Sequence, residues 1–386
     1  MKTILGLLFI PLLWSCNATA KKEQKKKADS VSYLPTNSVQ LTPQEKEHYH
    51  NLVSNFLDST LLRQRFNGEI LVAKNGEVIY EKYIGYKNLK TKDTLTPQTS
   101  FQIASTSKTL TSAATLQLIQ EGKLKLDTKV SDIIPGFPFT DITVKNLLSQ
   151  RSGLPEYLYF FEKGGWQRNK MATNNDVITA LTTWELPRAF NPNRHFDYCN
   201  TNFVLLASII EKVTGLPYPV YMRLHVFEPL GMSNTFVATA PDTANLTQSF
   251  DGFGKQWALD FSDGAYGDKN IYSTPRDLLK WDQALYSGKF IAQNLIDSAF
   301  TPYSNEKPSM HNYGLGWRML LLPNGKKVIY HNGRWHGFNS AFARLVDEKV
   351  TIIILSNKFN KNVYFVARKM YDLFGKYDGK QEEGLE

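Results

Sequence analysis

Patterns typical of β-strands lie near both ends of this chain, whereas the long stretch between them has mostly helical and loop patterns. Two β-rich runs within residues 67–88 flank Asn75-Gly76, a dipeptide strongly associated with two-residue hairpin turns. Three further short strands are expected within residues 326–357, with Asp347-Glu348 as the turn into the last of them. We therefore expect one sheet that is built from both ends of the chain.

Helical patterns flank and interrupt these strand patterns. Residues 41–62 begin with Thr42, Pro43 and Glu45, which suit the cap, the first position and the capping-box partner of a helix. Another helix is expected to close the chain at residues 361–375. Further helices are expected in the middle of the chain, at residues 101–122, 201–215 and 273–288. This order predicts an α/β protein of the α+β sandwich type: a mixed, mainly antiparallel sheet flanked by helices, with an inserted all-helical region.

Composition divides the chain into segments. Residues 17–40 are polar, Lys-rich and without apolar periodicity, as expected of a tether. The expected segments are a signal peptide at residues 1–16, the tether at 17–40, a folded domain at 41–376 and a polar tail at 377–386. Within the domain we expect a sheet region at about residues 41–130 and 290–376, and a helical insertion at about 131–289.

The N-terminus has the pattern of an export signal. Residues 1–16 combine a basic start at Lys2 with an apolar run over residues 4–14, which is too short to span a bilayer. The run ends at Ser15-Cys16 and resembles the lipobox of bacterial lipoproteins, in which the Cys becomes the lipidated N-terminus. This predicts a lipoprotein of the bacterial cell envelope, facing the periplasm or the cell surface and anchored to the membrane through Cys16.

Trp14 fits a lipobox poorly, so secretion as a soluble protein after cleavage nearby is the alternative. If Cys16 is lipidated, no intramolecular disulfide forms, because Cys199 is the only other thiol.

The formal charge of +9 resembles that of a nucleic-acid-binding protein, but nearly half of this charge lies in the first 30 residues. Residues 1–30 hold six Lys against Glu23 and Asp29, a net +4, so the remainder carries +5. That charge is weak for a polyanion binder. We therefore expect no nucleic-acid partner. The chain has neither a Walker glycine loop nor a G-x-G-x-x-G after a strand, so nucleotide binding has no support and no cofactor is expected.

Ser105 and Lys108 form an S-x-x-K pair at the start of the helix expected at residues 101–122. Residues three apart on a helix face the same way, with Cβ atoms about 5–6 Å apart, so the hydroxyl and the amine can meet. The free N–H groups of a helix N-terminus would also stabilise an alkoxide or an oxyanion. Ser304 and Lys307 repeat the spacing in a loop, so the pair alone leaves a structural role open.

Tyr198 and Asn200 form a Y-x-N directly before the helix expected at residues 201–215. Because apolar residues lie on both sides, the phenol could be held in a cleft and accept the serine proton; the alternative is a core tyrosine. His331, Gly333, Arg334 and His336 gather at one strand end, where a glycine allows close approach of a substrate and the Arg334 N–H could donate to an oxyanion.

The ordered set S-T-S-K, Y-C-N and H-N-G resembles the serine β-lactamase and penicillin-recognising hydrolase family, nearest its class C branch, which also contains esterases and D-amino-acid peptidases. The likeness covers about residues 45–375 and includes LLSQRSGLPEY, GDKNIYSTPRDLLKW and YGLGW. It implies a mixed sheet between helices beside an all-helical region. It also implies site roles: Ser105 as nucleophile, Lys108 and Tyr198 as proton partners, Asn200, His331 and Gly333 in substrate binding, and the N–H groups of Ser105 and Arg334 as oxyanion donors.

Two departures from the family pattern concern charge. His331 stands where penicillin-binding members usually have Lys, so a fixed positive charge would become pH dependent. Arg334 stands where a small residue is common, and its side chain could restore that charge or block the pocket.

The leading hypothesis is a serine hydrolase that forms an acyl-enzyme at Ser105 and acts on an ester, a D-amino-acid amide or peptide, or a β-lactam-like carbonyl. A non-catalytic or sensor-type binding module for cell-wall fragments or β-lactams is the alternative. A metal site is not expected, since H-E-x-x-H is absent and His48 and His50 lie on a scaffold helix. An α/β-hydrolase is disfavoured because G-x-S-x-G is absent.

The sequence leaves the substrate's acyl and leaving groups and the oligomeric state open. Aromatic residues of the segment LPEYLYFFEKGGWQ could line the substrate pocket or form a helical core; they are Tyr157, Tyr159, Phe160 and Trp166.

Overall fold

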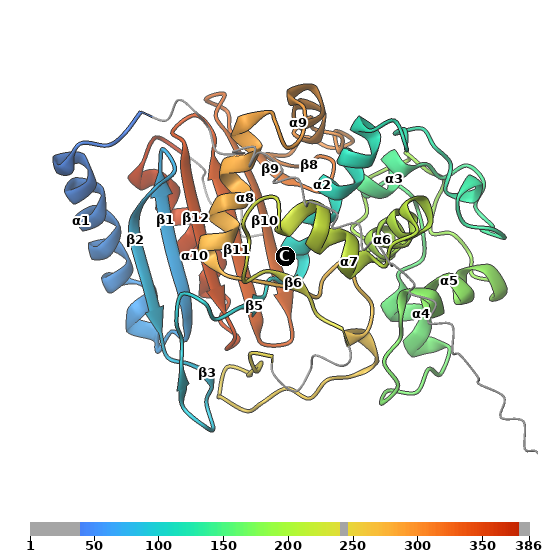
Figure 1. Cartoon of the computed structure of the whole chain (residues 1–386), viewed down its shortest axis with the longest axis horizontal. Coiled ribbons are helices and arrows are strands. Elements are labelled where there is room, and N and C mark those ends of the chain that lie inside the picture. The colour runs from blue at the N-terminus through green and yellow to red at the C-terminus, as the bar shows by residue number, and fades with distance from the viewer. Residues whose placement is uncertain (1–38, 240–245, 378–386) are drawn as a thin grey trace, which may run out of the picture. The chain divides into compact units, whose positions relative to one another are not determined.

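A seven-stranded sheet joins strands from the two ends of the chain (Figure 1). The strands lie in the order β2-β1-β12-β11-β10-β9-β8, and every neighbouring pair is antiparallel. The first hairpin pairs directly with the last strand, since Gly68 lies opposite Ser356. The strands are β1 (Gly68–Lys74), β2 (Glu77–Ile84), β8 (His311–Tyr313), β9 (Arg318–Leu321), β10 (Lys327–Trp335), β11 (Phe338–Leu345) and β12 (Val350–Ser356).

The computed structural model describes residues 39–239 and 246–377. The predicted signal peptide with Cys16, nearly all of the tether at 17–40 and nearly all of the tail at 377–386 lie outside the described residues. Those assignments stay predictions.

Helices cover both faces of the sheet (Figure 1). On one face α1 (Pro43–Ser59) packs on β2, and α10 (Asn362–Lys369) packs on β11 and β12. On the other face α8 (Pro275–Ser287) packs on β1 and β12. The predicted cap of α1 is confirmed, because Thr42 Oγ1 accepts from the Glu45 N–H at 3.2 Å and Glu45 accepts from the Thr42 N–H at 2.8 Å.

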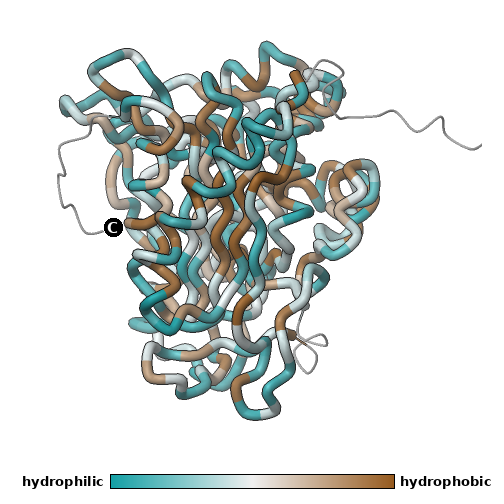
Figure 2. Tube along the Cα trace, turned by 90° about the vertical axis from the view of Figure 1, so that its left-hand side faces the viewer, coloured by the Kyte–Doolittle hydropathy of each residue, from teal (hydrophilic) through white to brown (hydrophobic). Residues whose placement is uncertain are grey.

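The sheet strands are apolar on both sides because both sides are covered. In β1, Ile70 and Val72 enter the core under α1 and α10, whereas Leu71 and Ala73 enter the core shared with α8 and the helical region. Figure 2 shows these strands as hydrophobic segments in the middle of the molecule. The expected fold class is confirmed. Each neighbouring pair in the large sheet runs antiparallel.

The middle of the chain forms the helical region, which lies to one side of the sheet (Figure 1). It contains α2 (Ser107–Gln120), α3 (Val144–Leu148), α4 (Tyr157–Lys163), α5 (Asn174–Thr183), α6 (Thr201–Thr214) and α7 (Tyr218–Met222), and α9 (Gln293–Ala299) follows α8. Short strands also form there, among them β5 (Phe101–Gln102), which pairs with β7 (Ile271–Ser273).

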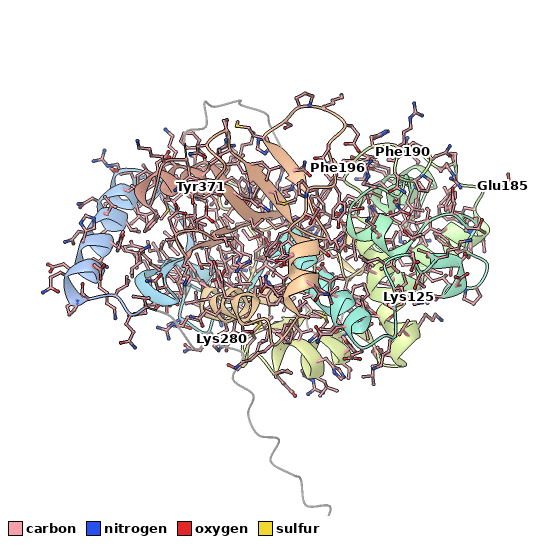
Figure 3. All side chains as sticks on the ribbon, turned by 90° about the horizontal axis from the view of Figure 1, so that it is seen from above. Lys125, Glu185, Phe190, Phe196, Lys280 and Tyr371 are labelled. Atoms are coloured by element: carbon pink, nitrogen blue, oxygen red, sulfur yellow. The ribbon has the colours of Figure 1, made fainter. Side chains whose placement is uncertain are left out.

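Side chains fill the space between these elements (Figure 3). Of the aromatic residues in LPEYLYFFEKGGWQ, Tyr157 and Phe160 are buried in the core and Trp166 packs against it, whereas Tyr159 is 65% exposed. In the described part of the chain no single helix is long and apolar enough to cross a membrane. α6 and the helix that follows it reach the required length and hydropathy only when they are taken together, and the two are bent by 81° relative to each other.

Glu69 is a buried carboxyl group near the start of β1, in this apolar sheet. It lies on β1 opposite Tyr83 and Leu355, and neither carboxyl oxygen has a hydrogen-bond partner within residues 39–239 and 246–377. Burial, together with the nearby Glu81 carboxylate, raises the pKa of Glu69 well above its usual value. The carboxyl group is therefore protonated in the fold over a pH range in which it is ionised in the unfolded chain.

We expect Glu69→Gln to stabilise the protein at pH 8 and to have little effect near pH 4. A raised folded-state pKa gives stability that is present below the unfolded pKa and is lost as pH rises toward the folded value. The neutral amide avoids that loss, which we expect to be about 1 kcal/mol or more at pH 8. Thermal unfolding of the unaltered protein and of Glu69→Gln across this pH range measures the difference in stability, with the exposed Glu47→Gln as control. An equal effect at both pH values would contradict the prediction.

Candidate active site

Ser105 lies in a tight turn between β5 and α2. Residues 104–106 form a 3-10 turn that leads directly into α2, and Ala104 has a left-handed backbone with φ of +48°. A non-glycine residue in that region stores strain, which is frequent at functional sites. Every residue from Phe101 to Leu116 is buried except Ser105. The fold therefore presents this one hydroxyl from an otherwise buried segment.

The Lys108 amine is held beside the serine. Its Nζ lies 3.2 Å from Ser105 Oγ, 2.9 Å from Asn200 Oδ1 and 2.8 Å from the Asp268 carbonyl oxygen. The amide and carbonyl oxygens can only accept, so each takes an N–H of the amine. The third position around the nitrogen faces the serine. In the neutral amine, that position is the lone pair that can take the serine proton.

The orientation of Asn200 is fixed from behind by Glu156. Glu156 Oε2 accepts from the Asn200 backbone N–H at 2.7 Å and from its side-chain Nδ2 at 3.1 Å. This leaves Asn200 Oδ1 directed at Lys108. Burial raises the pKa of Glu156, and the nearby Asp268 acts in the same direction. Glu156 was not among the predicted site residues, although it is the Glu of the LLSQRSGLPEY segment.

Tyr198 lies between two cations. Its ring centroid is 4.9 Å from Lys108 Nζ and 5.1 Å from Arg318 Cζ. Among the described residues its buried hydroxyl has no hydrogen-bond partner. Arg318 is the first residue of β9, directly after the YGLGW segment. It was not among the predicted site residues, because an arginine at a strand start carries no sequence signal of a site.

His331 is buried on β10 and is uncharged at neutral pH. Burial lowers its pKa well below the usual value, and the positive charges of Arg318 and Lys108 lower it further. Its Nδ1 lies 2.7 Å from the Asn332 carbonyl oxygen and its Nε2 lies 3.4 Å from the Tyr313 hydroxyl. A carbonyl accepts only, so Nδ1 carries the proton. His331 therefore does not supply the charge of a motif lysine.

The serine turn packs against β10 beyond the point where its pairing with β9 ends at Tyr330. Thr106 Oγ1 donates to the His331 carbonyl at 3.2 Å and lies 2.8 Å from Ser340 Oγ. A Cβ on Gly333 would lie 2.3 Å from the Ile103 carbonyl oxygen and 2.9 Å from the Ser105 nitrogen. Only glycine allows the strand to approach the nucleophile this closely.

The structure brings most of the predicted site residues together. Ser105, Lys108 and Asn200 share hydrogen bonds, Tyr198 and His331 lie beside them, and Gly333 touches the serine turn. The Arg334 side chain is different: it is exposed, and its Cζ lies 4.9 Å above the Phe359 ring.

The second S-x-x-K copy has a local role. Ser304 Oγ donates to Asn312 Oδ1 and accepts from the Tyr313 N–H, both at 3.0 Å. These contacts tie Ser304 into its loop.

Asp260, Asp263 and His336 form a group whose ligand atoms lie within 4.8 Å of one another. Their contacts already serve the local structure, since Asp263 accepts from Trp335 Nε1 at 2.7 Å and lies 3.0 Å from His336 Nε2. This group is not in hydrogen-bond contact with the serine.

The site combines a serine, an amine and a phenol. These groups lie at helix starts, beside the open edge of an antiparallel sheet. Together they define a serine hydrolase site of the β-lactamase and penicillin-binding-protein fold. A family model described as "Beta-lactamase" matches residues 60–375. The chain belongs to this family.

Individual relatives and solved structures support the family assignment and the fold. Penicillin-binding protein 4* of Bacillus subtilis is 32% identical over 318 residues, which cover 78% of this chain and 70% of that protein. A penicillin-binding protein from Bacillus halodurans (TM-score 0.73, 22% identity, 85% of this chain and 99% of that chain) and the D-amino acid amidase of Ochrobactrum anthropi (TM-score 0.68, 24%, 85% and 97%) share the fold.

We expect Gly333→Ala to leave the protein folded but to slow acylation of Ser105 by about 100-fold, because the added methyl group displaces the serine turn. The rate of labelling by a fluorophosphonate measures it. Gly252→Ala is the matched control, since a Cβ there would meet its nearest atom at 3.7 Å. Equal labelling rates in the two variants would show that the close approach is not required.

Proposed function

We propose that this protein is a serine hydrolase that forms an acyl-enzyme at Ser105 and transfers the acyl group to water. Its substrate would be an ester, a D-amino-acid amide or peptide, or a β-lactam-like carbonyl. The observation that carries the proposal is the position of the Lys108 amine, with two N–H groups bound elsewhere and its third position facing Ser105 Oγ. A module that binds its ligand without covalent chemistry would not need this arrangement.

In the proposed mechanism, Ser105 Oγ attacks the substrate carbonyl and its proton passes to Lys108 Nζ. The backbone N–H groups of Ser105 and Arg334 would stabilise the oxyanion. The bond to the leaving group then breaks, the leaving group takes a proton from the Tyr198 hydroxyl, and Lys108 returns its proton to Tyr198. Water cleaves the acyl-enzyme by the same transfers in reverse. The cations beside the Tyr198 ring would stabilise negative charge on its oxygen during the transfer.

We expect Ser105→Ala to abolish hydrolysis, with a loss of at least about 10³-fold, because the nucleophile is removed. A panel of a chromogenic cephalosporin, short p-nitrophenyl esters and D-alanyl peptides measures it, and intact mass after fluorophosphonate treatment detects the covalent adduct. Ser304→Ala, the serine of the second S-x-x-K, is the matched control and should keep both activity and adduct. Hydrolysis that survives in Ser105→Ala, or that EDTA abolishes, would refute the proposal.

We expect the acylation rates of Lys108→Met and Tyr198→Phe to depend differently on the leaving group of the substrate. Loss of the proton acceptor should slow esters and amides alike. Loss of the phenol should slow amides by about 10-fold more than p-nitrophenyl esters, because nitrophenolate leaves without protonation. Acylation rates of the two substrate types in each variant measure this. The reverse pattern, with esters more sensitive to Tyr198→Phe, would exchange the two roles.

A further inference from the structure

Two buried groups of opposite charge lie behind the Lys108 amine. Asp268 and Lys269 belong to the segment GDKNIYSTPRDLLKW, shortly before β7, and each side chain is only 2% exposed. Lys269 Nζ lies 3.0 Å from Asp268 Oδ2. The backbone carbonyl of Asp268 accepts from Lys108 Nζ at 2.8 Å. One member of this buried ion pair therefore contacts the amine that faces the serine.

Tyr157 and Trp335 enclose the Lys269 ammonium. Lys269 Nζ donates to the Tyr157 hydroxyl, which in turn donates to Asp268 Oδ2 at 3.2 Å. Burial raises the pKa of Tyr157 and the neighbouring Asp268 raises it further, so the phenol keeps the proton that it donates. Lys269 Nζ also lies 4.4 Å from the centroid of the Trp335 ring and 4.9 Å from that of Tyr157. The ammonium is therefore surrounded by protein groups and paired with Asp268.

The Asp268 carboxylate depends on this ammonium, because a buried ion needs a partner of opposite charge. Its other oxygen, Oδ1, is buried and has no hydrogen-bond partner in the part of the chain that the structure describes. Without Lys269, the Lys108 ammonium would be the cation already in contact with Asp268. Lys108 would then be stabilised in its protonated form, which has no lone pair to take the serine proton.

Other titratable groups around these two lysines come from several elements. Burial raises the pKa of Glu156 and lowers that of His331, so both neutral forms are favoured. The Asp268–Lys269 pair differs from them because it contributes two full charges that cancel. The remaining groups are Tyr198 before α6 and Arg318 on β9, which face Lys108 or Tyr198, and Asp263 with His336, which lie behind Trp335.

We propose that Lys269 neutralises the Asp268 carboxylate and thereby keeps Lys108 available as an uncharged amine. The inference rests on the proposed function, in which Lys108 accepts the serine proton. Lys269 is a positioning residue in this role, because it acts on the reaction through Asp268 and Lys108. Loss of the Lys269 charge alone should keep Lys108 protonated to higher pH. Loss of both charges of the pair should restore the original pH dependence.

The pH dependence of Ser105 labelling by a fluorophosphonate tests this, with intact mass as the readout of the labelling rate. We expect Lys269→Met to move the acidic limb of the rate upward by about 1 pH unit or more. Asp268→Asn combined with Lys269→Met should return the limb to its position in the unaltered protein. Lys280→Met is the matched control, because Lys280 also pairs with a buried aspartate, Asp277, at 2.9 Å, and it should leave the limb in place.

An acidic limb that stays in place in Lys269→Met, that the double variant does not restore, or that moves equally in Lys280→Met would overturn the proposal. Loss of packing alone would slow labelling at every pH, and a second substitution would not repair it. Lys269→Gln removes the charge with a side chain that can still donate to Asp268. It should give the same upward shift, and it serves if Lys269→Met does not fold.

A titration of Lys108 separates this proposal from the proposed function. In Ser105→Ala protein with isotope-labelled lysine, the NMR signal of Lys108 reports its protonation without any reaction, and its absence from Lys108→Arg identifies it. Adding Lys269→Met should move this titration to higher pH whether or not Ser105 is the nucleophile. A titration that does not move would overturn the charge-balancing role. Failure of the proposed function appears instead as hydrolysis that does not need Ser105.

Discussion

The site depends on one close contact, between the serine turn and the open edge of β10. Gly333 leaves no room for a Cβ between the strand and the Ile103 carbonyl, and Ser340 Oγ of β11 donates to that same carbonyl at 2.7 Å. The turn therefore packs against the sheet on one side, while α2, which follows it, packs against α6 in the helical region on the other. A nucleophile held from both sides loses little freedom when a substrate binds, so more of the binding energy can be used at the reacting carbonyl.

Local patterns predicted the parts of the fold whose signals are local. The Asn75-Gly76 hairpin, the capping box at Thr42 and the helix that begins at Pro275 formed where turn and cap residues placed them. The strands β8 and β9 were missed, since they contain only three and four residues and include the polar His311 and Arg318. β9 is fixed by its pairing with β10 and β8 by its pairing with β9, and no short window of sequence contains those pairings.

The site was predictable in its residue types but less so in its charges. The contact between Ser105 and Lys108 was predicted from their spacing and is present. The helix expected at residues 101–122 begins only at Ser107, however, and Ser105 lies in the 3-10 turn before it. The charge state of His331 was not predictable from the sequence, because it depends on burial and on two cations from other elements. Arg334 followed a different rule: side chains alternate along a strand, so a residue adjacent to Gly333 turns to the opposite face, toward Phe359. Glu156 and Arg318 join the site only through tertiary structure.

The pairing of β1 with β12 also has a consequence for how the protein is made. Gly68 and Ser356 are neighbours in the sheet but lie at opposite ends of the folded chain, so closing that pair encloses almost the whole polypeptide in one loop. Contacts of such high sequence separation form slowly. Neither the edge of β10 nor its support from β11 and β12 exists until the last strands emerge from the ribosome. The nucleophile is therefore set in place only when synthesis is nearly complete, and a prematurely terminated chain carries Ser105 without the sheet edge that positions it.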